Sequence, residues 1–203
     1  MSETTSSPRL GERFREALGY AAELHNTQTR KASQVPYIGH LLSVAGLVIE
    51  ADGTETEAIA ALLHDAAEDQ GGEAILAEIE ERFGNEVAKI VDECSDTVIT
   101  PKPPWRQRKE DYVAHLHEAS DSTIRVSMAD KLDNARAILR DLRRHGPQVW
   151  QRFNTSDPHD HLWYYRSLLD VYRQRSDSWL VDELARVIQA LEEEVGPPVA
   201  ATV

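Results

Sequence analysis

Residues 60–69 read AALLHDAAED, and within this apolar run an adjacent histidine and aspartate stand at positions 64 and 65. The apolar flanks predict that His64 and Asp65 are buried. A buried ionisable group is costly unless a partner or a metal ion compensates its charge. An imidazole beside a carboxylate is a suitable donor pair for a divalent metal. This stretch therefore predicts a helical core built around a polar, metal-binding pair.

Two further candidate ligands lie far from this pair in sequence. His40 ends the segment PYIGH, and Asp130 lies in MADKLDN. His40, His64–Asp65 and Asp130 fall on three different predicted helices, as a site in the core of a helical bundle requires. A lone histidine–aspartate dipeptide is more simply read as a buried ion pair, but the joint pattern favours a metal site.

The donor set combines two imidazoles with two carboxylates and leaves room for water and a phosphate oxygen. Such ligation suits Mn²⁺ or Fe²⁺, and Zn²⁺ is an alternative. A structural zinc site would more often use cysteine and be closed. The open set predicts catalysis, in which the metal polarises a phosphoryl oxygen and lowers the pKa of bound water.

Composition narrows the class of protein. The 203 residues are 41% hydrophobic and 28% charged, which is typical of a soluble globular domain. The net charge of −13 argues against nucleic acid or an acidic membrane as partner, because such surfaces need clustered positive charge. A single cysteine, Cys94, excludes an internal disulfide and indicates a reducing compartment. With no apolar run near the ~20 residues of a membrane span, we expect a cytoplasmic protein.

The apolar period is helical almost everywhere, which predicts an all-α bundle of about eight to ten helices. We expect a disordered leader over 1–7, one domain over 8–195 and a tail over 196–203. Thr54 and Glu57 form a capping box, and Val98–Ile99 is the one candidate extended piece. The predicted helices cover about 11–25, 37–51, 55–69, 75–83, 87–94, 105–119, 122–144, 159–175 and 178–194.

An acidic pair, Glu68 and Asp69, follows the opening motif. On a continuous helix Glu68 shares a face with His64 and Asp65, and Asp69 shares one with Asp65. The pair is therefore a candidate for positioning or deprotonating water beside the metal. The alternative is a pair of solvated acids at a helix end, although acidic residues there oppose the helix macrodipole.

Basic and amide side chains flank the ligands. Arg30 and Lys31 precede the PYIGH segment, and an arginine can grip a phosphate or stack on a base. Lys131 and Asn134 follow Asp130 and are candidates for substrate contact, while Asp133 is a candidate for holding a ligand in place. The arginines further along this helix are read as an ordinary solvated face: Arg140, Arg143 and Arg144.

These motifs resemble the hydrolase domain of the RelA/SpoT group. The resemblance rests on residues 25–31, 36–40, 60–69, 83–84 and 129–134, and it covers roughly 14–145. Because the chain has no room for a synthetase domain, it is most similar to the small, Mesh1-like alarmone hydrolases. The resemblance implies an HD-domain fold and a Mn²⁺-dependent reaction. That reaction removes the 3′-pyrophosphate of guanosine tetra- or pentaphosphate (ppGpp or pppGpp) and gives GDP or GTP.

Carried over by position, the resemblance also implies roles for individual residues. The implied metal ligands are His40, His64, Asp65 and Asp130; the implied catalytic acids are Glu68 and Asp69; the implied nucleotide contacts are Arg30, Lys31 and Asn134. The expected partner is a small nucleotide. Self-association through the apolar C-terminal helix is possible, but core packing explains its leucines equally well.

The chain departs from the resembled motifs in the loop at 32–35 and at Leu41, Gln70, Asp133 and Ala137. These departures leave other substrates open: an adenosine alarmone, a nucleoside monophosphate or NADPH. A metal-occupied binding module without turnover is a further alternative. The aromatic cluster at 163–165 (WYY) either fills the core, which we favour, or caps the pocket.

Overall fold

The computed structural model describes residues 10–31, 34–96, 101 and 103–197. Over these residues the chain forms ten α-helices and one 3₁₀ helix, η1, and the extended pairing is limited to a bridge between Thr29 and Pro36. The predicted all-α architecture is therefore confirmed. The helices are α1 Glu12–Leu24, α2 Ile38–Glu50, α3 Glu55–Leu63, α4 Ala66–Gln70, α5 Glu73–Phe83, α6 Asn85–Cys94, α7 Trp105–Leu116, α8 Asp121–His145, η1 Pro147–Arg152, α9 Pro158–Arg175 and α10 Trp179–Val195.

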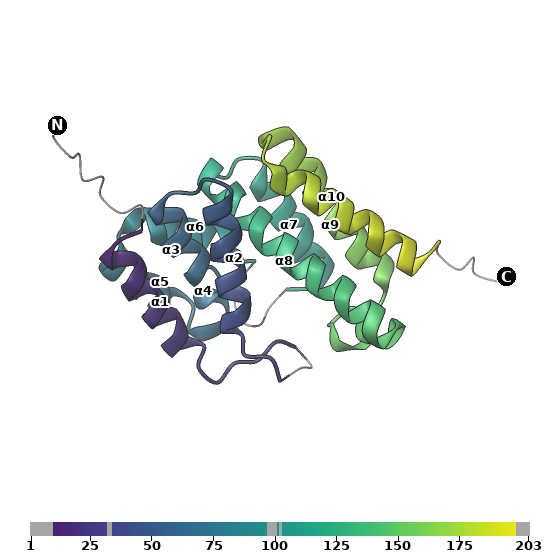
Figure 1. The fold of residues 1–203 in the computed structure, drawn as a ribbon, viewed down its shortest axis with the longest axis horizontal. Coiled ribbons are helices and arrows are strands. Elements are labelled where there is room, and N and C mark those ends of the chain that lie inside the picture. Colours follow the sequence, from purple (N-terminus) through teal and green to yellow (C-terminus); the bar gives the residue numbers. More distant parts are fainter. Residues whose placement is uncertain (1–9, 32–33, 97–100, 102, 198–203) are drawn as a thin grey trace, which may run out of the picture.

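The long helix α8 is the centre of the arrangement. It contacts α2, α3 and α6 on one side and α9 and α10 on the other, so it lies between the two halves of the chain (Figure 1). Its last turn carries Arg143, Arg144 and His145. Positive charge at this position interacts favourably with the negative end of the helix dipole. Because α8 faces both halves, side chains on it can complete a site begun by the N-terminal helices.

Helix α3 is the most deeply buried element of the N-terminal half. Ala58 to Leu63 are all 0% exposed, as expected for a helix that is apolar on every side. The predicted capping box is present, because the Thr54 side chain accepts from the Glu57 amide and Glu57 reaches back to Thr54. The cap and the apolar faces together fix the position of the C-terminal end of α3, which His64 directly follows.

The prediction of one helix over 55–69 is wrong. Helix α3 ends at Leu63 and α4 begins at Ala66, so His64 and Asp65 occupy a turn between two helices. Asp65 has φ −97° and ψ −1°, in the sparsely populated bridge region where the regular helical ladder is interrupted. As a result Glu68 and Asp69 lie in the first turn of α4, and the argument that they oppose a helix dipole does not apply.

Helix η1 was not predicted. Gly146, with φ 74°, ends α8, and Pro147 begins η1. Several predictions lie outside the described residues: the leader over 1–7, most of the tail and the extended piece at 98–99. Among the described helices none is long and apolar enough to pass through a lipid bilayer.

Candidate metal centre and pocket

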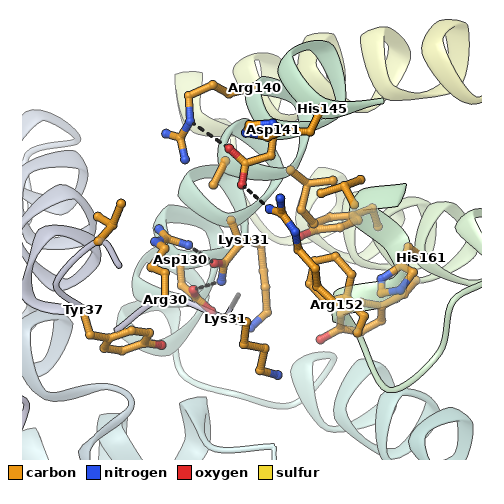
Figure 2. A pocket seen from close by; sticks show the side chains of 18 of the residues that line it. Arg30, Lys31, Tyr37, Asp130, Lys131, Arg140, Asp141, His145, Arg152 and His161 are labelled. Carbon is orange, nitrogen blue, oxygen red and sulfur yellow. Dashed lines mark hydrogen bonds and ion pairs between the residues drawn. The ribbon is translucent and has the colours of Figure 1, made fainter. Parts of the chain in front are cut away.

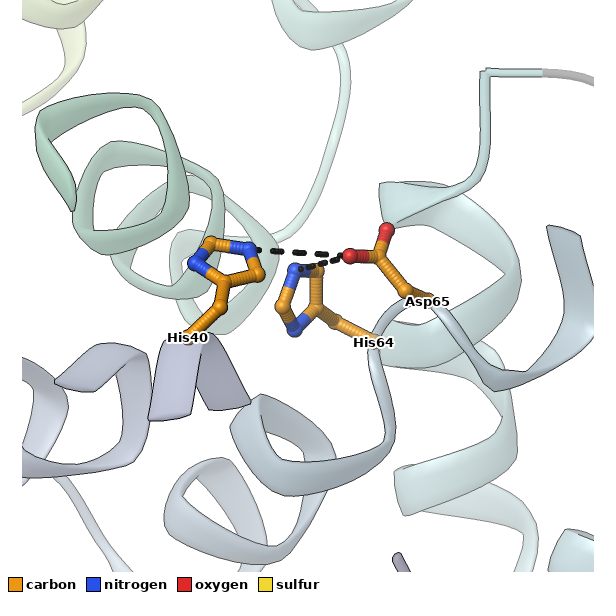
Figure 3. Close-up of side chains that lie close together, drawn as sticks. All are labelled: His40, His64 and Asp65. Atoms are coloured by element: carbon orange, nitrogen blue, oxygen red, sulfur yellow. Dashed lines mark ion pairs between the residues drawn. The ribbon is translucent and has the colours of Figure 1, made fainter. Parts of the chain in front are cut away.

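The four predicted ligands meet where α2, the α3–α4 turn and α8 come together. Figure 3 shows His40, His64 and Asp65 pointing toward one another. His64 Nε2 lies 3.0 Å from Asp65 Oδ2 and 3.6 Å from Asp130 Oδ1. His40 Nε2 lies 3.2 Å from Asp130 Oδ1 and 3.6 Å from Asp65 Oδ2. The chain therefore brings two imidazole nitrogens and two carboxylate oxygens around one point.

Two imidazole nitrogens that face the centre of the cluster have no hydrogen-bond partner among the described residues. They are Nε2 of His40 and Nε2 of His64, and both are buried. The other nitrogen of His64, Nδ1, is 2.8 Å from the Ala61 carbonyl oxygen. A carbonyl only accepts, so Nδ1 carries a proton, and in the neutral ring Nε2 presents a lone pair. This donor set fits a divalent cation.

Charges in the cluster are strongly coupled. Burial alone would lower the pKa of His40, but the carboxylates of Asp130, Asp133 and Asp65, which accept from the protonated ring, outweigh it and raise the pKa to about 9. Burial likewise opposes the charged forms of His64 and Asp65, yet their mutual attraction raises the pKa of His64 and lowers that of Asp65. In the metal-free protein, protons on the imidazoles therefore compensate the carboxylates, a role that a metal ion can take over.

Metal binding is consequently expected to release protons and to tighten as pH rises. A ligand must lose its proton before it can bind a cation. The pKa of His40 is raised to about 9, so proton competition is strong at neutral pH and disappears above that value. Calorimetric titration of the metal-free protein with Mn²⁺, in buffers of different ionisation enthalpy, measures the protons released. An affinity that does not change with pH would contradict this account.

Neighbouring side chains hold the two carboxylate ligands. Lys131 Nζ contacts Asp130 Oδ2 at 2.5 Å, and Asn134 Nδ2 donates to Asp130 Oδ1 at 2.5 Å. The Tyr37 hydroxyl donates to Asp65 Oδ2 at 2.5 Å. Lys131 and Asn134 were predicted to contact substrate; in the structure both are bonded to a candidate metal ligand. Tyr37 was not singled out from the sequence, although it lies three residues before His40.

Arg30 and Asp133 form a second group beside His40. Asp133 Oδ2 lies 2.7 Å from His40 Nδ1 and also accepts from Arg30 Nη2. Arg30 Nη1 donates to Asn134 Oδ1 at 3.0 Å. The loop that carries Arg30 is held by hydrogen bonds from the Arg30 amide to the Val35 carbonyl and from the Tyr37 amide to the Gln28 carbonyl.

The acidic pair lies next to the centre, on α4. Asp69 Oδ2 accepts from Gln28 Nε2 at 2.7 Å, and Glu68 Oε2 accepts from the backbone amide of Asp96 at 3.3 Å. Part of Asp69 is exposed, yet burial of its carboxyl group and the negative charge of Asp65 raise its pKa. A carboxylate with a raised pKa beside a metal site is a candidate general base.

A cavity of about 720 Å³ opens from Asp65 and Asp130 toward the far end of α8, which is a volume typical of small-molecule sites. Figure 2 shows Tyr37 and Arg30 at one side of it and Arg152 and His161 at the other. Although the chain is acidic overall, seven basic and three acidic side chains line the cavity among the described residues. The basic ones are Arg30, Lys31, Lys109, Lys131, Arg140, Arg144 and Arg152.

The far end of the cavity was not predicted. Arg152 comes from η1 and pairs with Asp141 at 3.2 Å, while Arg140 lines the cavity where an ordinary solvated face was expected. The only sequence signal was the basic character of 136–152. Tyr164 and Tyr165 are buried in the core and also line the cavity, so the two alternatives for this aromatic cluster are not exclusive.

The fold and the converging donor atoms define an all-α domain built around a candidate divalent-metal site. An HD-domain family model matches residues 17–157, and the chain belongs to this family. The guanosine-3′,5′-bis(diphosphate) 3′-pyrophosphohydrolase MESH1 of Xenopus tropicalis is 40% identical over 138 residues, covering 66% of this chain and 72% of that protein. The Homo sapiens MESH1 is 35% identical over 145 residues, covering 70% and 76%.

A solved structure gives the same result in three dimensions. It is described as a metazoan ortholog of SpoT that hydrolyses ppGpp, and it superposes with a TM-score of 0.74 at 27% identity. The superposition covers 95% of this chain and 100% of that one. The predicted resemblance to small alarmone hydrolases is therefore confirmed.

Proposed function

We propose that this chain is a metal-dependent pyrophosphohydrolase that removes the 3′-pyrophosphate of guanosine tetra- or pentaphosphate. The observation that carries the proposal is the cluster of His40, His64 and Asp65, with Asp130 beside the two histidines, which opens into a basic, nucleotide-sized cavity. The relatives with this activity in their names support the substrate class. Mn²⁺ is the proposed ion, because the mixed nitrogen and oxygen donors suit it, as they suit Fe²⁺.

His40, His64, Asp65 and Asp130 would hold the ion, which supplies a Lewis acid for a phosphoryl oxygen and lowers the pKa of water. Asp69 would accept a proton from the attacking water, and Glu68 would position that water. Lys31 is exposed at the cavity wall and is the proposed phosphate contact. Lys131 and Asn134 would act mainly by fixing Asp130, because each is hydrogen-bonded to it.

The far end of the cavity would receive the remaining phosphates of the substrate. Arg140 and Arg152 share Asp141 as their partner, so the approach of a phosphate competes with one carboxylate rather than with two. Trp105, Phe153 and His161 add an aromatic wall on which a base can stack. The chain's overall negative charge would otherwise repel such a ligand, and the local basic lining removes that objection.

The test is a nucleotide panel under Mn²⁺. We expect the purified protein to release pyrophosphate from guanosine tetraphosphate and to lose this activity when a chelator removes the metal. The panel also contains adenosine alarmones, nucleoside monophosphates and NADPH. These are included because the aromatic wall does not by itself select a base. Turnover of one of these instead of guanosine tetraphosphate would reassign the substrate. Metal and nucleotide binding with no product would indicate a binding module.

A further inference from the structure

We propose that Asp133 is a positioning residue that fixes the orientation and tautomer of the ligand His40 and anchors Arg30 through the same oxygen atom. The inference rests on the metal-binding part of the proposed function. Asp133 Oδ2 is 2.7 Å from His40 Nδ1 and accepts from Arg30 Nη2. The His40 side chain is 0% exposed and that of Asp133 is 18% exposed, so water competes little for these contacts.

The geometry around His40 Nδ1 allows two arrangements of the proton. Arg30 Nη2 also lies 3.0 Å from this nitrogen, and a guanidinium only donates hydrogen bonds, whereas a carboxylate only accepts them. Nδ1 either carries a proton and donates to Asp133, or is bare and accepts from Arg30. In the second arrangement the neutral ring carries its proton on Nε2, which faces the metal site.

Only the first arrangement presents a lone pair to a metal ion. Asp133 favours it by accepting from Nδ1, and it also engages the Arg30 N–H group that would otherwise donate to the ring. A carboxylate behind a ligating histidine fixes the tautomer and raises the basicity of the ligand. His64 receives the same support from the Ala61 carbonyl. Of the two imidazoles, His40 is therefore the one whose orientation depends on a replaceable side chain.

The same contact fixes one wall of the cavity. Asp133 and Asn134 hold the two ends of the Arg30 guanidinium, because Nη1 donates to Asn134 Oδ1 at 3.0 Å. Asn134 in turn donates to the ligand Asp130. The arginine is thus a fixed part of the metal centre's surroundings, and disturbing Asp133 is expected to change the metal affinity and the cavity wall together.

Titration of the metal-free protein with Mn²⁺ and Zn²⁺ by calorimetry tests the proposal. We expect Asp133→Ala to weaken metal binding by about 10–100-fold. Asp133→Asn, whose amide oxygen can still accept from Nδ1–H, should stay close to wild type. The double variant Arg30→Ala with Asp133→Ala should regain part of the loss, because the competing donor is gone. Asp170→Ala, an exposed acid on α9, is the matched control.

A second readout follows the proton itself. In the Zn²⁺-loaded protein labelled with ¹⁵N-histidine, NMR should show a protected Nδ1 proton on His40 in the wild type and in Asp133→Asn. Equal losses of affinity in the Asn and Ala variants would show that only the charge matters and would overturn the proposal. So would unchanged affinity in Asp133→Ala. A wild-type protein that binds no metal would instead overturn the proposed function. Thermal unfolding of each variant serves as the control that the variant is folded.

Discussion

Asp65→Asn is expected to slow pyrophosphate release from guanosine tetraphosphate by at least about 10³-fold, because the metal supplies several kcal/mol of transition-state stabilisation. Asp65 Oδ2 lies within 3.6 Å of both ligand imidazoles, close enough to bind the same ion as they do. The substitution preserves the size of the side chain and removes its charge. Steady-state kinetics and the metal content of the purified variant measure the two consequences.

The matched control is Asp92→Asn, an exposed acid on α6, which should leave activity and metal content unchanged. If Asp65→Asn lost only affinity for the ion, a large excess of Mn²⁺ should restore part of the rate. Wild-type turnover in the variant at ordinary metal concentration would remove Asp65 from the ligand set. That result would also remove the main support for metal-dependent hydrolysis.

The helices and the four ligands could be predicted because each leaves a local trace. Apolar residues recur with the helical period, and His64, Asp65 and Asp130 stand out as ionisable residues inside apolar segments. Burial makes such residues costly unless they are compensated, so their position alone suggests a joint role. The structure then places His64 Nε2 3.0 Å from Asp65 Oδ2 and 3.6 Å from Asp130 Oδ1, although no local feature of the sequence specifies these distances.

The rest depends on contacts between distant segments. The apolar pattern continues across positions 64 and 65 and therefore hides the turn between α3 and α4. Arg30 and Asp133 are separated by 103 positions, so nothing local shows that the arginine is bonded to the carboxylate. The position of Arg152 likewise depends on how η1 folds back onto α8. The sequence therefore predicted substrate contacts for Arg30, Lys131 and Asn134, although in the structure each is hydrogen-bonded to another side chain of the protein.

Asp69→Asn is expected to lower kcat by about 10²–10⁴-fold, the usual contribution of a general base, while metal affinity stays near that of the wild type. Asp69 lies four residues beyond Asp65 on α4, and its carboxylate is held by Gln28 Nε2 at 2.7 Å. The amide of the variant has nearly the same shape but cannot take a proton from water. A change in KM or metal affinity with little change in kcat would contradict the assignment.

The pH profile separates a base from a merely structural acid. Burial, and next the charge of Asp65, raise the pKa of Asp69. A base acts only when ionised, so kcat at saturating Mn²⁺ should fall as pH drops through the pKa of Asp69, which burial raises and the charge of the bound ion lowers. Gln28→Leu removes a hydrogen bond that lowers the pKa and should shift this acidic limb to higher pH. If the limb persisted unchanged in Asp69→Asn, the titrating base would be another group.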